Sequence, residues 1–320
     1  MTTGPTPRAA PSVPGPVRRW VLGARPRTLP AAIVPVVVGT AAAHPFQSAA
    51  DLPRHSWWFA LGALVVGLAI QVGTNYANDY SDGIRGTDDV RVGPVRLVAA
   101  GLAPATAVKR AALIAFSVAG VVGLALAWAT SWWVLLVGAA CLAAGWLYTG
   151  GPRPYGYAGL GELFVFVFFG LVATVGTYYV QTLSLDRWPV WLAAALVGLL
   201  ASALLLANNL RDIETDRQTG KRTLAVRAGR RAGGRVFAAF VAVPFVVVLA
   251  WGVWSVATGA PAHPAAPFAP LLAAPLAVAP VRLVGSDASG RQLLPVLGAT
   301  GRLQLAFGAL LAVSLWLWVS

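Results

Sequence analysis

Charged residues, cysteine and histidine are scarce in this sequence of 320 residues. Only 11% of the residues are charged, whereas 58% are hydrophobic and the mean hydropathy is +0.70. An average soluble domain has about 25% charged residues, so this composition excludes a soluble globular protein, a disordered chain and a nucleic-acid-binding domain. The single cysteine, Cys141, excludes a disulfide framework and a cysteine-based metal site. The net charge of +13 therefore indicates the basic loops of a membrane protein.

Long apolar runs dominate what is present. A spanning helix needs about 20 mostly apolar residues, and nine segments approach that length. They are Thr28–Ala43, Trp57–Tyr76, Ala111–Thr130, Ser131–Tyr148, Leu160–Tyr179, Trp188–Leu206, Val236–Val256, Pro264–Val281 and Leu303–Val319. The eighth segment contains Pro270, Pro275 and Pro280, which predict a kinked or broken helix.

The basic residues are distributed unequally among the loops. With nine crossings and a cytoplasmic N-terminus, every lysine and arginine except Arg54 and Arg187 falls on the cytoplasmic side. This is the asymmetry that the positive-inside rule requires. We therefore expect an all-α polytopic protein of the cell (plasma) membrane, with nine transmembrane helices in a single domain over residues 20–320. Residues 1–19 are rich in proline without the apolar run of a signal peptide, so we expect a disordered cytoplasmic tail there.

Most of the 11 acidic residues lie in two short segments, residues 75–89 and 208–222, which directly follow the second and the sixth predicted helix. Each segment pairs an asparagine with an aspartate four positions later, and this spacing places both side chains on one face of a helix. The pairs are Asn78 with Asp82 and Asn208 with Asp212, and the second stripe continues to Asp216. We expect each helix to extend by a turn or two. The offset of four helices suggests two similar four-helix halves that face each other.

Clustered carboxylates beside apolar helices are costly unless a cation neutralises them. Oxygen ligands from aspartate and asparagine suit hard divalent cations, above all Mg²⁺, which prefers to share its shell with a substrate phosphate. Basic side chains among the acids would hold a diphosphate as well. They are Arg85, Arg91, Arg96, Arg211, Lys221 and Arg222. Two alternatives stay open: both segments are solvated loops, or the chain is a cation transporter, although its acids lie at helix ends rather than at mid-membrane.

The sequence resembles the UbiA-type superfamily of intramembrane aromatic prenyltransferases over about residues 20–320. That superfamily has nine transmembrane helices, with the motif N-D-x-x-D-x-x-x-D after the second and D-x-x-x-D after the sixth. The matching residues here are Asn78, Asp79 and Asp82 in the first motif and Asp212 and Asp216 in the second. The last position of the first motif is Gly86, and Asp88 follows two residues later. This form, with residues 25–30, 93–96 and 148–152, is similar to the branch that prenylates 1,4-dihydroxy-2-naphthoate.

The resemblance implies transfer of a polyprenyl group from a polyprenyl diphosphate to 1,4-dihydroxy-2-naphthoate, with loss of CO₂ and diphosphate. The product would be demethylmenaquinone, for menaquinone biosynthesis, and Mg²⁺ would be the cofactor. Within the superfamily the acceptor could instead be 4-hydroxybenzoate, homogentisate or a tetrapyrrole. The implied metal ligands are Asp79, Asp82, Asp88, Asp212 and Asp216. The implied catalytic residues are Asn78, Asp82, Asp212, Asp216 and Tyr148.

We also expect a set of substrate-binding residues near the motifs. They are Arg27, Arg85, Arg96, Arg153, Asn208, Arg211, Lys221, Arg222 and Glu162. Many superfamily members carry Y-x-x-x-K after the fourth helix. Here Tyr148 matches the tyrosine, but Pro152 stands at the position of the lysine. The next residue, Arg153, would either replace that lysine or be only one of the cytoplasmic arginines of the positive-inside rule. Glu162 would bind the acceptor, act as a base or be an interfacial charge. The sequence leaves the prenyl chain length, the catalytic base and the oligomeric state open.

Overall fold

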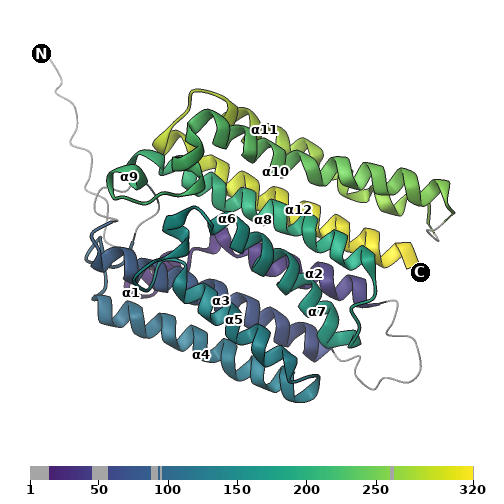
Figure 1. The fold of residues 1–320 in the computed structure, drawn as a ribbon, viewed down its shortest axis with the longest axis horizontal. Helices are drawn as coiled ribbons and strands as arrows, with labels where there is room; N and C mark the ends of the chain where they lie inside the picture. The colour runs from purple at the N-terminus through teal and green to yellow at the C-terminus, as the bar shows by residue number, and fades with distance from the viewer. Residues whose placement is uncertain (1–13, 45–56, 88–92, 94–95, 260–262, 320) are drawn as a thin grey trace, which may run out of the picture.

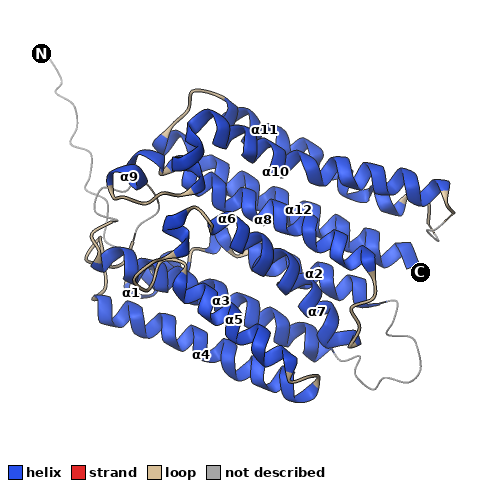
Figure 2. Cartoon of the chain, in the orientation of Figure 1, coloured by secondary structure: helices blue, strands red, loops and turns tan. Residues whose placement is uncertain are grey.

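The computed structural model of this chain describes residues 14–44, 57–87, 93, 96–259 and 263–319. Every regular element in these residues is a helix (Figure 2). In chain order the elements are α1 (Pro16–Ala24), η1 (Pro26–Thr28), α2 (Pro30–Ala43), α3 (Trp57–Ile84), α4 (Ala105–Ala129), α5 (Trp133–Leu147), η3 (Tyr155–Ala158), α6 (Gly161–Val165), η4 (Phe166–Val172), α7 (Ala173–Thr182), α8 (Trp188–Arg211), α9 (Ile213–Gln218), α10 (Leu224–Ala257), η5 (Ala266–Ala273), α11 (Ala274–Gly285), η6 (Gly290–Leu293) and α12 (Leu294–Val319). The η elements are 3₁₀ turns, apart from the π-helical η4.

The long helices lie side by side as a bundle (Figure 1). Within the described residues seven helices are long and apolar enough to cross a membrane. The pair α1–α2, bent by 54°, would make an eighth span. The remaining predicted segment contains α5, which at 15 residues is shorter than a typical span. The chain is thus an all-helical membrane protein with seven or eight candidate spans, and the count of nine stays a prediction.

Proline acts as expected in the eighth predicted segment but not at the N-terminus. The eighth segment is broken into the 3₁₀ turn η5 and the helix α11. By contrast, α1 begins at Pro16, inside the predicted disordered tail, because proline is favoured in the first turn of a helix. Contacts then fix this helix: the Tyr76 hydroxyl donates to the carbonyl of Trp20 at 2.8 Å, and Arg19 Nη1 donates to the carbonyl of Leu102 at 2.7 Å. Residues 16–19 of the expected tail therefore belong to a helix, and residues 1–13 lie outside the described residues.

Helices α3 and α8 both continue past their apolar segments, as the polar spacing predicts. Helix α3 ends at Ile84, and α8 ends at Arg211 with α9 starting at Ile213. Along α3, Gln71, Asn75, Asn78 and Asp82 recur at intervals of four, three and four residues and therefore share one helix face. Each helix thus carries its polar stripe from the apolar bundle to one end of it.

Helix α8 is the most deeply buried candidate span, and it meets η4 at a pair of glycines. A Cβ added to Gly170 would lie 2.4 Å from Gly198 Cα and 2.9 Å from the carbonyl oxygen of Ala194. Small residues allow such close approach of two helices in a membrane protein. We expect Gly170→Ala to destabilise the fold by about 1–3 kcal/mol, because the backbones must separate. The measurement is the melting temperature in detergent.

The matched control for this prediction is Gly176→Ala in α7. A Cβ at Gly176 has no atom within 4 Å in the described part of the chain. The melting temperature of this control should therefore stay close to that of the wild type. If Gly170→Ala melts at the same temperature as Gly176→Ala, the close packing of η4 on α8 is contradicted.

Candidate functional site

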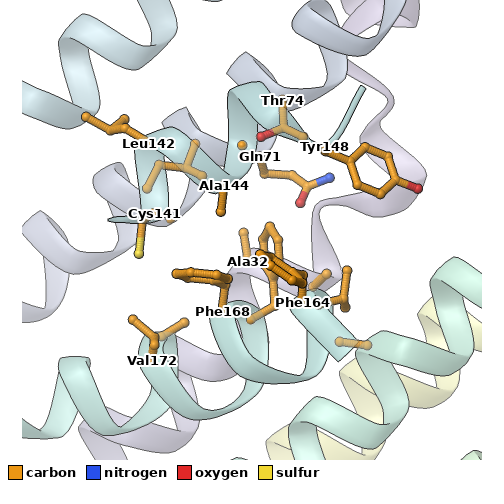
Figure 3. A pocket seen from close by; sticks show the side chains of 18 of the residues that line it. Ala32, Gln71, Thr74, Cys141, Leu142, Ala144, Tyr148, Phe164, Phe168 and Val172 are labelled. Carbon is orange, nitrogen blue, oxygen red and sulfur yellow. The ribbon is translucent and has the colours of Figure 1, made fainter. Parts of the chain in front are cut away.

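A cavity of about 790 Å³ opens among α2, α3, α4, α5, α8 and the helix formed by α6, η4 and α7. Its walls are largely apolar and aromatic, with Phe164 and Phe168 facing Gln71 across the hollow (Figure 3). At one end of the cavity, polar and charged lining residues come from the ends of α3 and α8 and from the loops and short helices beside them. They include Asn78, Asp82, Arg96, Thr149, Tyr157, Asn208, Asp212, Asp216 and Lys221. The two Asp-rich segments therefore meet at one cavity, although about 130 residues of sequence separate them.

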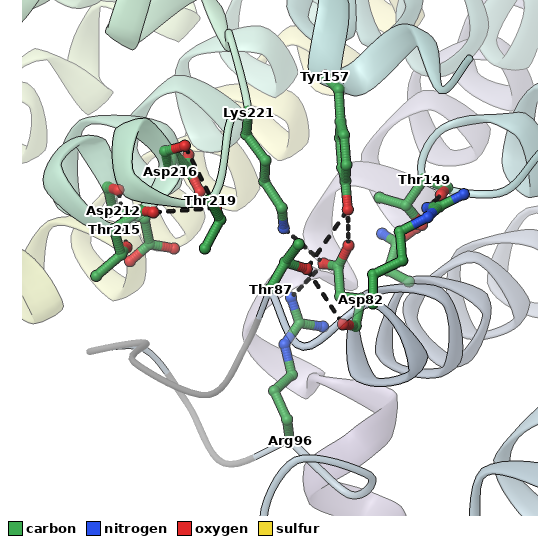
Figure 4. A network of polar contacts seen from close by, with 12 residues as sticks. Asp82, Thr87, Arg96, Thr149, Tyr157, Asp212, Thr215, Asp216, Thr219 and Lys221 are labelled. Atoms are coloured by element: carbon green, nitrogen blue, oxygen red, sulfur yellow. Dashed lines mark hydrogen bonds and ion pairs between the residues drawn. The ribbon is translucent and has the colours of Figure 1, made fainter. Parts of the chain in front are cut away.

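Asp82 is the centre of a polar network at this end of the cavity (Figure 4). The Tyr157 hydroxyl donates to Oδ1 at 2.6 Å. Lys221 Nζ lies 3.0 Å from Oδ2, and Arg96 Nη2 lies 3.5 Å from the same oxygen. Two cations thereby offset the cost of burying this carboxylate. Because Lys221 follows α9, the lysine of the second segment binds the aspartate of the first, and the ion pair holds the two segments together.

Tyr157 lies in η3, and its ring is also part of this network. Lys221 Nζ lies 4.9 Å from the ring centroid. Burial, and secondarily the Asp82 carboxylate, raise the pKa of the Tyr157 hydroxyl above its ordinary value. The hydroxyl therefore keeps its proton at neutral pH and remains a donor to Asp82.

The second segment presents Asp212 and Asp216 to the cavity, one helical turn apart. The backbone N–H of Asp216 donates to the carbonyl of Asp212 at 2.8 Å, which continues the helical path from α8 into α9. Arg211 was expected to bind substrate, but it is buried beside Asp212 and donates to both carboxylate oxygens at 2.7 Å. A bidentate pair of this kind fixes the orientation of a carboxylate. Asn208 lines the cavity, as expected of a substrate contact.

Asp79 lies away from the cavity lining. Its two carboxylate oxygens accept the backbone N–H groups of Leu97 and Val98 at 2.8 and 3.0 Å. This contact anchors the loop that carries Arg96, so the structure gives Asp79 a positioning contact rather than the expected place among the metal ligands. The other expected ligand, Asp88, lies outside the described residues.

Besides Arg211, four more of the basic residues expected to bind substrate do not line the cavity. Arg27, Arg153 and Arg222 have exposed side chains. Arg85 donates to the carbonyls of Thr149 and Gly151. Long basic side chains at a helix end can reach water, which explains why sequence alone could not separate these residues from the two that line the cavity, Arg96 and Lys221.

Arg85 nevertheless acts on the site indirectly. It holds the loop after α5, in which the Thr149 hydroxyl donates to Asn78 Oδ1 at 2.7 Å. Thr149, Tyr157 and Arg25 also line the cavity. No role was predicted for them from the sequence, although residues 25–30 and 148–152 belong to the stretches that resemble the naphthoate-prenylating branch. Each of the three residues belongs to a loop or a short turn, where no helical period predicts the direction of a side chain.

Tyr148 and Glu162 were both expected near the reacting groups. Tyr148 lines the cavity and packs edge-to-face against Tyr155 at a centroid distance of 5.5 Å. Glu162 is buried but does not line the cavity, and its Oε1 accepts a hydrogen bond from Asn209 Nδ2 at 2.8 Å. It also lies in the first turn of α6, the position expected of a helix-start charge.

The donor set suits Mg²⁺ only if a substrate completes its coordination shell. In the part of the chain that the structure describes, no three His, Cys, Asp or Glu side chains come close enough to hold a metal ion. Mg²⁺ is usually bound by one or two carboxylates together with waters and substrate phosphates. Asn78 and Asp82 on one wall, and Asp212 and Asp216 on the other, offer the oxygen ligands that such a shared shell needs.

Comparison with known proteins agrees with this arrangement. The chain is 48% identical to the 1,4-dihydroxy-2-naphthoate octaprenyltransferase of Mycobacterium tuberculosis, over 93% of this chain and 96% of that protein. It is 34% identical to the Escherichia coli protein of the same name, over 93% and 95% of the two chains. The fold is similar to that of a UbiA homolog from Archaeoglobus fulgidus bound to GPP and Mg²⁺, with a TM-score of 0.58 and 14% identity over 91% of this chain and 98% of that one.

The sequence also matches a family model over most of its length. The model of the UbiA prenyltransferase family covers residues 32–288, which include both Asp-rich segments and most of the residues that line the cavity. The resemblance inferred from the motifs is thereby confirmed, and this chain belongs to the UbiA prenyltransferase family.

Proposed function

We propose that this chain transfers a polyprenyl group from a polyprenyl diphosphate to 1,4-dihydroxy-2-naphthoate in menaquinone biosynthesis. The observation that carries the proposal is the single cavity in which Asp82 and Asp212, from separate Asp-rich segments, line the polar end of an otherwise apolar wall. The names and the 48% and 34% identities of the two relatives support the choice of acceptor. The structure of the Archaeoglobus homolog with GPP and Mg²⁺ supports a prenyl diphosphate and that metal as ligands.

The polar end of the cavity suits the diphosphate. Arg96 and Lys221 both pair with Asp82. When a diphosphate enters, its oxygens would compete with the Asp82 carboxylate for these two cations and accept charge-assisted hydrogen bonds from them. Mg²⁺, held by Asp82, Asp212, Asp216 and Asn78, would stabilise the charge that develops on the departing diphosphate. The geometry supports a reaction driven by stabilisation of the leaving group.

The bond changes balance without an oxidant or a net transfer of protons. The C–O bond of the allylic diphosphate breaks, and both electrons leave with the diphosphate. A ring carbon of the naphthoate forms the new C–C bond, and the carboxylate group leaves as CO₂, which returns its electron pair to the ring. The immediate product is the hydroquinone form of demethylmenaquinone.

The remaining walls suit an allylic cation and its tail. Tyr148, Phe164 and Phe168 line the cavity, and aromatic faces attract a cation while apolar walls exclude water. The lining extends to Trp191 near the start of α8, about 30 Å along the helix from Asp212 at 1.5 Å per residue. An apolar chain could therefore extend along the bundle and leave between helices into lipid.

We extend the proposal to the topology. Nine crossings require that α5 and the bent pair α1–α2 each span the membrane, and the near absence of basic residues from the predicted outer loops supports that count. The N-terminus and the Asp-rich end of the cavity then lie on the cytoplasmic side of the plasma membrane.

An acceptor competition assay tests the proposed function. The purified protein in detergent receives one polyprenyl diphosphate, Mg²⁺ and equal concentrations of 1,4-dihydroxy-2-naphthoate, 4-hydroxybenzoate and homogentisate. Mass spectrometry of the products should show the prenylated, decarboxylated naphthalene in large excess. A dominant product from either of the other acceptors would overturn the choice of acceptor.

A further inference from the structure

A second polar group lines the cavity at a distance from the Asp-rich end. Gln71 Nε2 and Asn75 Nδ2 donate to Thr28 Oγ1 at 3.0 and 3.1 Å, and Asn75 Nδ2 also lies 2.9 Å from the carbonyl oxygen of Ala24. The Thr28 hydroxyl in turn donates to the carbonyl of Arg25 at 2.9 Å. These bonds tie the turn between α1 and α2 to the cavity face of α3. Arg25, Thr28, Gln71 and Asn75 all line the cavity.

Arg25 brings a positive charge to this group. Its Nη2 atom is buried and has no hydrogen-bond partner among the residues that the structure describes. Its backbone has φ 53° and ψ 68°, in the left-handed region that residues other than glycine rarely adopt. Arg25 as a whole is half-buried, but a buried N–H group of a guanidinium is stabilised by an anionic or hydrogen-bonding partner. Arg25 therefore offers this donor to an anionic group in the cavity that it lines.

The position of Arg25 relative to the diphosphate end fits an anionic group on the acceptor. Asn75 and Gln71 precede Asp82 by seven and eleven residues, which correspond to about 10 and 16 Å along α3. Reacting atoms must come within about 3–3.5 Å of each other, so the acceptor ring must lie just beyond the diphosphate. Phe164 and Phe168 face Gln71 across the same hollow and offer surfaces on which a flat ring can stack (Figure 3).

We propose that Arg25 binds the carboxylate of the aromatic acceptor, on a wall that Thr28 orders through Gln71 and Asn75. The inference rests on the proposed function, because it deepens the account of the same cavity. The subsite takes an aryl carboxylate, and its cation comes from the turn before α2 rather than from either Asp-rich segment. Arg27, which sequence reasoning favoured, is exposed two residues away and serves as the matched control.

The test compares two binding probes of nearly equal shape, 2-naphthoate and its neutral amide, 2-naphthamide. Each is titrated by calorimetry into the full chain in nanodiscs. The wild type and Arg27→Gln should bind the carboxylate about tenfold or more tightly than the amide, as expected for hydrogen bonds to a charged group. Arg25→Gln should bind the two probes within about twofold of each other, and Arg25→Lys should keep part of the preference, since it keeps the charge.

Steady-state kinetics provide a second test. A purely structural role of Arg25 would not change KM for the acceptor while leaving KM for the prenyl diphosphate unchanged. Arg25→Gln should raise KM for 1,4-dihydroxy-2-naphthoate about tenfold or more and leave KM for the prenyl diphosphate within about twofold. A rise in KM for the prenyl diphosphate instead, or an unchanged carboxylate preference in Arg25→Gln, would overturn the assignment. If the wild type prenylates no naphthoate, the proposed function fails, whereas the titrations still decide whether Arg25 selects an aryl carboxylate.

Discussion

Replacing Asp216 with asparagine should lower kcat for prenyl transfer by about a hundredfold to a thousandfold. Asp216 lines the cavity one turn after Asp212, where a carboxylate can share a metal ion with the diphosphate. Asparagine keeps the size and one oxygen of the side chain but removes the charge that balances the metal ion. The loss should therefore appear in the transition state for departure of the diphosphate, and single-turnover kinetics at saturating substrate measure it.

The control for Asp216→Asn lies two residues earlier on the same short helix. The Glu214 side chain is 70% exposed, and it pairs with Arg217 at 3.3 Å on the surface of α9. Glu214→Gln removes one negative charge at almost the same place in the sequence, but it should change kcat by less than about twofold, because exposed ion pairs contribute little. A similar loss of kcat in both variants would mean that the rate depends on the overall negative charge of α9 and not on Asp216 as a metal ligand.

Removal of divalent metal should abolish transfer without unfolding the protein. No three acidic, cysteine or histidine side chains of the described residues form a metal cage, and the ion pair of Lys221 with Asp82 joins the two Asp-rich segments without a metal. We therefore expect the fold to persist when the ion is removed. EDTA should therefore reduce the rate to background and leave the melting temperature nearly unchanged, and added Mg²⁺ should restore the rate. Because the substrate completes the coordination shell, Mg²⁺ should bind more tightly when a non-hydrolysable prenyl diphosphate analogue is present.

Two results would contradict this account of the metal. Full activity in EDTA would mean that Arg96 and Lys221 alone neutralise the leaving group. A large fall in melting temperature would mean that the ion is structural and is held by the protein itself. Calorimetric titration of Mg²⁺ with and without the analogue distinguishes a shared shell from a site formed by the protein alone.

Helical periodicity explains what the sequence could predict. The spacing of Asn78 and Asp82, and of Asn208 and Asp212, indicated two polar helix faces because positions four residues apart are neighbours on any helix. The structure brings the two faces to one cavity. The prolines of the eighth apolar segment predicted its break for an equally local reason, the missing N–H group and the clash of the ring with the preceding turn.

Contacts between segments could not be predicted in this way. The ion pair between Lys221 and Asp82 and the hydrogen bond from Tyr157 to Asp82 join residues far apart in the chain. No spacing rule connects them, because their positions depend on how η3 and the turn after α9 pack over the end of α3. The network that surrounds Asp82 is therefore visible only in three dimensions.

The sequence also could not show which of two neighbouring residues of the same type faces the cavity. Asp79 and Asp82 are three residues apart and differ by only about 60° around the helix axis, yet one anchors a loop and the other faces the cavity. Arg25 has left-handed backbone angles just before η1 and lines the cavity, whereas Arg27 lies within η1 and is exposed. Periodicity shows that a face is polar, but neighbouring elements decide which residue on it reaches the substrate.

The most direct test of the central claim uses 1,4-dihydroxy-2-naphthoate labelled with ¹³C in its carboxyl group. The purified chain is supplied with this acceptor, a polyprenyl diphosphate and Mg²⁺, and ¹³CO₂, diphosphate and prenylated product are quantified together by mass spectrometry and phosphate analysis. We predict equal amounts of all three, with no label in the product, and Asp216→Asn should form all three about a hundredfold to a thousandfold more slowly. A prenylated product that keeps the label, or release of diphosphate without any prenylated product, would contradict the account.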